Sequence, residues 1–141
     1  MLIGIPSVLS PDLLKILMEM GHGDEIVLAD GNFPSASMAK RLVRLDGHGI
    51  PAILDAILNL FPLDGYVDKP VAFMAVTPGD PYVPVIQKEY REIVKTRAGD
   101  AGIEEVGRFD FYDRAKQAYA IVATGEGARY ANVILKKGVV V

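Results

Sequence analysis

The sequence predicts a single-domain α/β sandwich over residues 1–141, with a mixed and mainly parallel sheet flanked by helices. Segments with helical periodicity, about 10 to 12 residues long, alternate with short apolar segments of strand length. Some of these apolar segments have no polar interruption, which is typical of strands covered on both faces. A chain of 141 residues fits one domain, and it contains no internal repeat, low-complexity tract or linker.

The first helix is indicated by its start and stop signals. Ser10 is a suitable N-cap, and Pro11 suits the first helical position. Apolar side chains then recur at helical spacing as far as Met20. Gly21 predicts the C′ end, where glycine commonly adopts a left-handed conformation.

The remaining elements follow from the same periodicities. We expect strands at residues 25–29, 40–45, 71–76, 103–106, 120–123 and 133–135, and helices at residues 50–60, 85–96 and 109–119. Residues 33–38 are expected to form a loop of small side chains, and residues 40–45 an edge strand. The last residues, Val139–Val141, continue a strand-like composition, and an edge of that kind is usually covered or paired, for example by another subunit.

Composition excludes several classes of protein. Acidic residues outnumber basic ones by 18 to 15, so a nucleic-acid partner is not expected. There is no cysteine for a disulfide or a thiolate ligand. No apolar run approaches the ~20 residues that span a bilayer, and the N-terminus lacks the features of a signal peptide, so a cytoplasmic protein is expected. The mean hydropathy of +0.24 suggests that some apolar surface is buried against copies of the chain.

His22 is the leading acid/base candidate, because an imidazole exchanges protons near neutral pH. It lies between two glycines, directly after the first predicted helix. A purely structural histidine is the alternative. The second histidine, His48, lies in a predicted turn and is expected to be exposed to solvent.

Two other patterns suggest sites only weakly. Asp24, Glu25 and Asp30 could form a metal site with His22, but their spacing matches no known metal motif. The segment Gly125-Glu126-Gly127 is similar to a phosphate-binding loop but lacks the Walker lysine and the Rossmann spacing, so a tight turn is the better interpretation. We therefore expect no metal and no nucleotide cofactor.

A group of hydrogen-bond donors suits a small polyhydroxylated ligand. Arg129, Tyr130 and Asn132 lie within a few residues of one another, and Arg108 is a further candidate. Sugar hydroxyls need forked donors and acceptors, and the apolar face of a sugar favours an aromatic neighbour. An ordinary polar loop is the alternative.

The chain also resembles the fucose mutarotase and ribose pyranase family over essentially its whole length. The similarity is carried by Met20–Ile26, Ala29–Pro34, Arg108–Ala115, Thr124–Glu126 and Tyr130–Val139. It looks like the fucose branch, because the ribose branch has a histidine at the position of Arg108.

The resemblance implies an enzyme that interconverts the α and β anomers of a free monosaccharide, without a cofactor and within a cyclic oligomer, typically a decamer. Carried over by motif, His22 takes the position of the proton donor. Asp30, Arg108, Tyr130, Ala131 and Asn132 take sugar-binding positions. The other hypotheses are a non-catalytic monosaccharide-binding module for uptake or sensing, and a ribose-type pyranase.

One geometric difficulty accompanies these roles. If residues 25–29 form a straight strand, His22 and Asp30 lie roughly 15 Å apart at about 3.3 Å per residue. They can meet over one sugar only if the chain folds back near Gly21 and Gly23, or if subunits pool residues across an interface.

Overall fold

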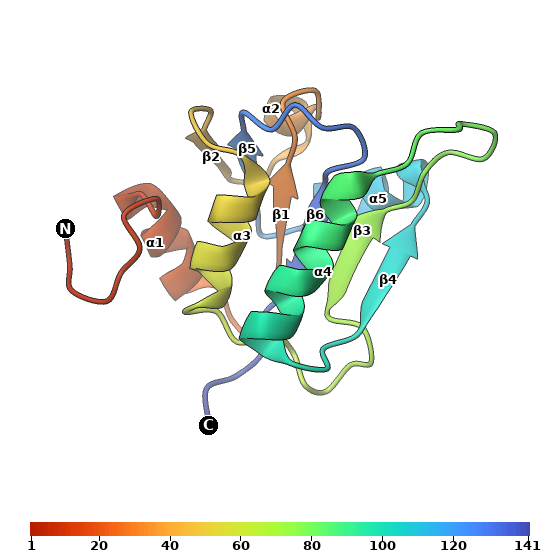
Figure 1. Ribbon diagram of the computed structural model, residues 1–141. Helices are drawn as coiled ribbons and strands as arrows, with labels where there is room; N and C mark the ends of the chain where they lie inside the picture. The colour runs from red at the N-terminus through yellow and green to blue at the C-terminus, as the bar shows by residue number, and fades with distance from the viewer.

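The computed structural model describes all 141 residues as five helices around a six-stranded sheet. The helices are α1 (Pro11–Glu19), α2 (Ser35–Met38), α3 (Ile50–Leu58), α4 (Val85–Ala98) and α5 (Arg108–Gln117). The strands are β1 (Glu25–Ala29), β2 (Leu42–Leu45), β3 (Val71–Met74), β4 (Ile103–Val106), β5 (Ala120–Thr124) and β6 (Val133–Lys136). The α/β architecture predicted from the sequence is confirmed (Figure 1).

The sheet has the strand order β2-β5-β1-β6-β3-β4. β1 and β2 both pair with β5 in parallel, and β3 pairs with β4 in parallel. β6 runs antiparallel to its neighbours β1 and β3, so it is the strand that makes the sheet mixed. As a result, the residues that precede β6 lie beside the residues that follow β1 and β3, at the C-terminal ends of the parallel strands.

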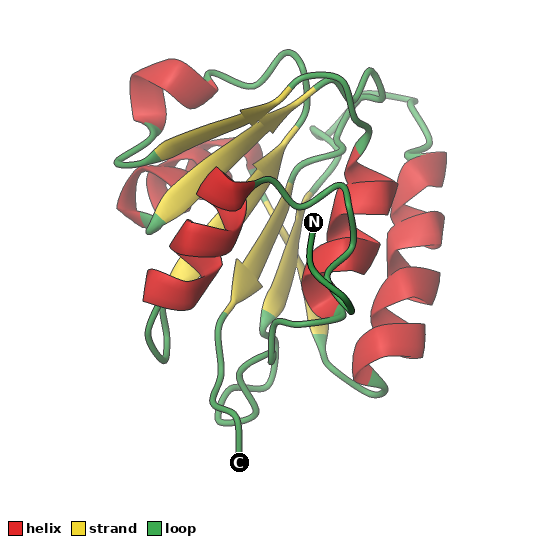
Figure 2. Ribbon diagram, turned by 90° about the vertical axis from the view of Figure 1, so that its left-hand side faces the viewer, coloured by secondary structure: helices red, strands yellow, loops and turns green.

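Helices cover both faces of the sheet (Figures 1 and 2). Alternate residues of β1 point to opposite faces, as the strand period of two requires. Ile26 and Leu28 belong to the larger core under α1, α3 and α4, whereas Val27 and Ala29 belong to the smaller core under α5. Every residue of β3 and β5, each paired on both sides, is buried, which explains their mainly apolar sequences.

The local signals placed most helix starts correctly. The hydroxyl of Ser10 accepts a hydrogen bond from Leu13 N at 3.2 Å, as expected of an N-cap. Gly21, however, does not form a left-handed C′ residue. The helix ends at Glu19, its C-cap Met20 is extended, and Gly23 adopts the positive φ of 87°.

Three differences from the predicted elements affect the function or the surface. The expected loop at residues 33–38 contains the short helix α2. Helix α5 begins one residue early, so that Arg108 is its first residue. Val139–Val141 form no strand and are exposed at the C-terminus. None of the helices combines the length and the apolar composition needed to cross a bilayer.

Candidate active site

A polar cavity of about 280 Å³ lies at the end of the sheet where β1 and β3 finish and β6 begins. Its lining contains four of the predicted sugar-binding residues, and the full set is Asp30, Asn32, Phe33, Met74, Thr77, Arg108, Tyr112, Arg129, Tyr130 and Asn132. Ala131, the fifth, does not line the cavity and is completely buried in the larger core. The structure therefore brings together residues about 100 positions apart in the sequence.

Asp30 and Asn132 form the floor of this cavity. The side-chain oxygen of Asn132 accepts a hydrogen bond from Asp30 N at 2.7 Å, and Asp30 Oδ1 accepts one from Asn32 N at 3.0 Å. Burial raises the pKa of the Asp30 carboxyl above its usual value, and the hydrogen bonds around it oppose this shift only in part. A buried carboxyl of this kind can hold sugar hydroxyls or exchange a proton with one of them.

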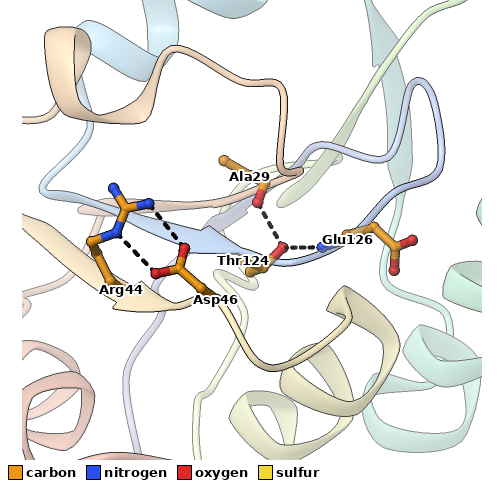
Figure 3. A network of polar contacts seen from close by, with 5 residues as sticks. All are labelled: Ala29, Arg44, Asp46, Thr124 and Glu126. Carbon is orange, nitrogen blue, oxygen red and sulfur yellow. Dashed lines mark hydrogen bonds and ion pairs between the residues drawn. The ribbon is translucent and has the colours of Figure 1, made fainter.

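The backbone on both sides of Asp30 is held by Thr124, the last residue of β5, and by Glu126 just after it; Figure 3 shows the contacts of Thr124. The Thr124 hydroxyl donates to Ala29 O at 2.8 Å, and Gly31 N donates to Glu126 O at 2.8 Å. The Glu126 carboxylate accepts hydrogen bonds from Ile50 N, at the start of α3, and from Ala128 N. The prediction of a tight turn between strands is wrong: residues 125–127 form no turn and begin the longer connection from β5 to β6, which are not neighbours in the sheet. The contacts of this segment are structural.

Arg108 and Tyr112 form the wall of the cavity on α5. They are four residues apart and therefore lie on the same helix face, where Arg108 Nε donates to the Tyr112 hydroxyl at 3.1 Å. The ring of Tyr112 packs edge-on against Phe33 at a centroid distance of 5.5 Å. An exposed guanidinium beside an aromatic surface suits a ligand with both hydroxyls and an apolar face.

Helix α4 fixes the backbone on the β6 side of the cavity. Gln87 Nε2 donates to Met74 O and to Tyr130 O, both at 3.0 Å, and the Tyr90 hydroxyl donates to Ala131 O at 2.9 Å. Tyr130 adopts a positive φ of 56°, which is uncommon for a side chain other than glycine, asparagine or aspartate. These contacts from α4 hold Tyr130 in that conformation.

His22 lies at the opposite end of β1 from Asp30. Its Nε2 is 3.0 Å from Asp64 Oδ1, and its ring is tilted against Tyr66 at a centroid distance of 5.3 Å. The hydrogen bond from Tyr66 N, together with the contact to His22, lowers the pKa of the nearly buried Asp64 carboxyl. The fold-back around Gly23 therefore directs His22 toward Asp64 and not toward Asp30.

The other candidates of the sequence analysis lie elsewhere. Asp24 Oδ2 accepts a hydrogen bond from Gly21 N, and Glu25 forms an ion pair with Arg114 at 2.6 Å. Neither approaches Asp30, so the metal interpretation is not supported by this placement. His48 is exposed in a turn, as predicted.

Some residues of the site were not predicted. Tyr112 could have been found from its spacing to Arg108, but no local pattern indicates that Thr77 lines the cavity. Outside the cavity, Asp64 and Asp80 reach His22 and Tyr130 through long-range contacts that the sequence does not reveal. A larger hollow of about 610 Å³ lies at the other end of the sheet and includes Asp64. We favour the smaller cavity because hydrogen-bonding groups from β1, β6 and α5 converge on it.

Residues 3–140 match the model of the RbsD / FucU transport protein family. The chain belongs to this family. Family members named L-fucose mutarotase, from Actinobacillus pleuropneumoniae, and fucose mutarotase, from Danio rerio, are 49% and 52% identical to it. These alignments cover 99% and 97% of this chain, and 97% and 93% of the respective relatives.

Solved structures of the family agree with the fold. The fucose mutarotase of Streptococcus pneumoniae in complex with L-fucose is 57% identical, with a TM-score of 0.94 over 99% of this chain and 100% of that chain. RbsD of Bacillus subtilis complexed with D-ribose is 26% identical, with a TM-score of 0.71 over 94% of this chain and 95% of that chain. Within the RbsD / FucU family, the chain therefore lies in the fucose mutarotase branch.

Proposed function

We propose that this protein is an L-fucose mutarotase, an isomerase that interconverts the α and β anomers of the free sugar. The observation that carries the proposal is the full-length identity of 57% with a fucose mutarotase whose structure contains L-fucose. The cavity lined by Asp30, Arg108, Tyr130 and Asn132 supports it, because these side chains supply the donors and acceptors that a monosaccharide needs.

The reaction requires two proton transfers. The ring oxygen gains a proton while the anomeric hydroxyl loses one, which opens the ring to an aldehyde. The carbonyl group then rotates, and the ring closes on the other face by the reverse transfers. A positioned acid or base contributes typically 10²–10⁴-fold, so side chains are sufficient for this chemistry.

We assign the proton donor role to His22 and sugar binding to Asp30, Arg108, Tyr130, Ala131 and Asn132. The Asp64 carboxylate holds His22 Nε2, so the other ring nitrogen, Nδ1, is the one that can face a ligand. Asp30, buried in the lining of the cavity, is the best-placed partner for the anomeric hydroxyl. In this scheme Tyr130 presents its ring and hydroxyl to the sugar.

The positions of His22 and Asp30 lead us to infer that each site is shared between two copies of the chain. The five residues of β1 separate them by roughly 15 Å within one protomer. His22 of the partner subunit would complete a site built around Asp30. If this contact is head-to-tail and its rotation closes, the copies form a ring, as the expected decamer requires.

Exchange NMR on L-fucose tests the activity. Anomer exchange should be faster with catalytic amounts of the wild-type protein than in buffer. With a His22→Ala variant, it should be slower than with the wild type. No acceleration for fucose, ribose or galactose would exclude the enzyme. The family is described as one of transport proteins, and the alternative of a non-catalytic sugar-binding module predicts sugar binding without any change in the exchange rate.

A mixing experiment tests the shared site. His22→Ala and Asp30→Ala should each be inactive alone, whereas co-expressed chains should recover roughly a quarter of the sites if copies pair at random. No recovery in mixed assemblies would contradict a site shared between subunits and leave the activity itself unaffected.

A further inference from the structure

The loop between β3 and α4 places one carboxylate against the proposed sugar site. This loop, residues 75–84, extends beyond the end of β3 (Figure 1). Asp80 Oδ2 accepts hydrogen bonds from the Tyr130 hydroxyl at 2.6 Å and from Arg129 Nη2 at 2.5 Å. Asp80 Oδ1 accepts one from Tyr82 N at 2.9 Å. The two side chains that Asp80 holds both line the cavity.

Asp80 is fixed by its own loop. Its backbone N donates to Thr77 O at 3.0 Å, which closes a turn through Gly79, whose φ is 89°. The Asp80 side chain is only 19% exposed, and the Tyr130 hydrogen bond, followed by those of Tyr82 N and Arg129, lowers the pKa of its carboxyl. It therefore stays ionised and accepts hydrogen bonds only.

The backbone and the side chain of Tyr130 are held by different elements. Gln87 fixes the backbone through the Tyr130 carbonyl, whereas the Tyr130 hydroxyl donates its hydrogen bond to Asp80 in the loop. The Tyr82 ring packs against the Tyr130 ring at a centroid distance of 5.9 Å, so the phenol lies between the loop and the cavity. Asp80 is the group that determines where the phenol proton points.

We propose that Asp80 is a positioning residue for the sugar site, and this inference rests on the proposed mutarotase function. By accepting the phenol proton, Asp80 leaves the oxygen lone pairs of Tyr130 as acceptors for a sugar hydroxyl. By holding the guanidinium of Arg129, it keeps a donor at the rim of the cavity. Asp80 itself does not line the cavity and is not assigned a contact with the sugar.

The test is a double-mutant cycle measured by exchange NMR on L-fucose, with thermal melting as a check of folding. The variants are Asp80→Ala, Tyr130→Phe and the double variant. Asp55→Ala is the matched control, because Asp55 holds Arg97 between α3 and α4 with two hydrogen bonds and lies outside the site. If Asp80→Ala does not fold, Asp80→Ser serves the same cycle, since serine suits the turn but cannot reach the phenol.

We expect Asp80→Ala to lower kcat/KM roughly tenfold to a hundredfold, mainly through KM, because hydrogen bonds to a charged group are lost. Asp80→Asn keeps an acceptor for the phenol and should recover most of the activity. In the Tyr130→Phe background, Asp80→Ala should lower kcat/KM by a factor at least several-fold smaller than it does in the wild-type background. The Asp55 control variant should have the kcat/KM of the wild type.

Two results would overturn the inference. The first is an unchanged kcat/KM in Asp80→Ala, and the second is an equal loss in both Tyr130 backgrounds, which would mean that Asp80 does not act through the phenol. A wild-type protein that does not accelerate exchange would instead refute the proposed function, so the two failures are distinguishable.

Discussion

Replacing Thr124 by valine tests whether the last residue of β5 stabilises the site. Thr124 is almost fully buried, and its hydroxyl both donates to Ala29 O at 2.8 Å and accepts from Glu126 N at 3.1 Å (Figure 3). Valine has the same shape but makes neither bond. With a net contribution of about 1 kcal/mol for each bond and a further cost for a buried group left unpaired, we expect a loss of about 2–3 kcal/mol.

Urea unfolding at fixed protein concentration measures this loss, since self-association would otherwise shift the apparent stability. Thr124→Ser is the matched control, because it keeps the hydroxyl and removes one methyl group. In exchange NMR, the valine variant should also show a higher KM, since Glu126 O holds Gly31 N beside Asp30. The reasoning is refuted if the valine variant is as stable as the serine variant or more stable.

Three further predictions follow from burial and close contacts. Burial raises the folded-state pKa of Asp30, so the wild type loses stability as pH rises from about 3.8 through that pKa. Asp30→Asn should therefore melt at a higher temperature than the wild type at pH 7 and lose this advantage below pH 4. An equal or lower melting temperature of the variant at pH 7 would contradict the raised pKa. Gly125→Ala would place a Cβ 2.0 Å from Asp46 O and should cost roughly 3 kcal/mol in urea unfolding, whereas Gly127→Ala, with open space around it, should be near neutral. Tyr90→Phe leaves Ala131 O without its donor and should lower the free energy of unfolding by about 1–2 kcal/mol. The variant should also bind sugar more weakly in a calorimetric titration. Unchanged stability would show that this hydrogen bond contributes nothing.

Local sequence signals predicted the elements better than their arrangement. The Ser10 cap and the apolar run of β1 depend on neighbouring residues, so both were predicted correctly. The antiparallel direction of β6 depends on pairing with β1 and β3, more than 50 residues away, and no local pattern encodes that choice.

The same distinction applies to the candidate site. Asp30 and Asn132 are polar residues at the ends of apolar strands, so their importance was visible in the sequence, but their adjacency was not. The contacts His22–Asp64 and Asp80–Tyr130 join residues 42 and 50 positions apart, and only the folded chain reveals them. The separation of His22 from Asp30 was anticipated as a difficulty, and the structure confirms that one protomer does not bring them together.

The buried amide of Gln87 makes two parts of the molecule mechanically dependent on each other. Its two hydrogens join the end of β3, at Met74 O, to the start of the β6 segment, at Tyr130 O. Neither segment can move away without losing its hydrogen bond to the amide that the two segments share. In hydrogen exchange, the loop after β3 and the segment around Tyr130 should therefore open as one cooperative unit, with a common opening free energy.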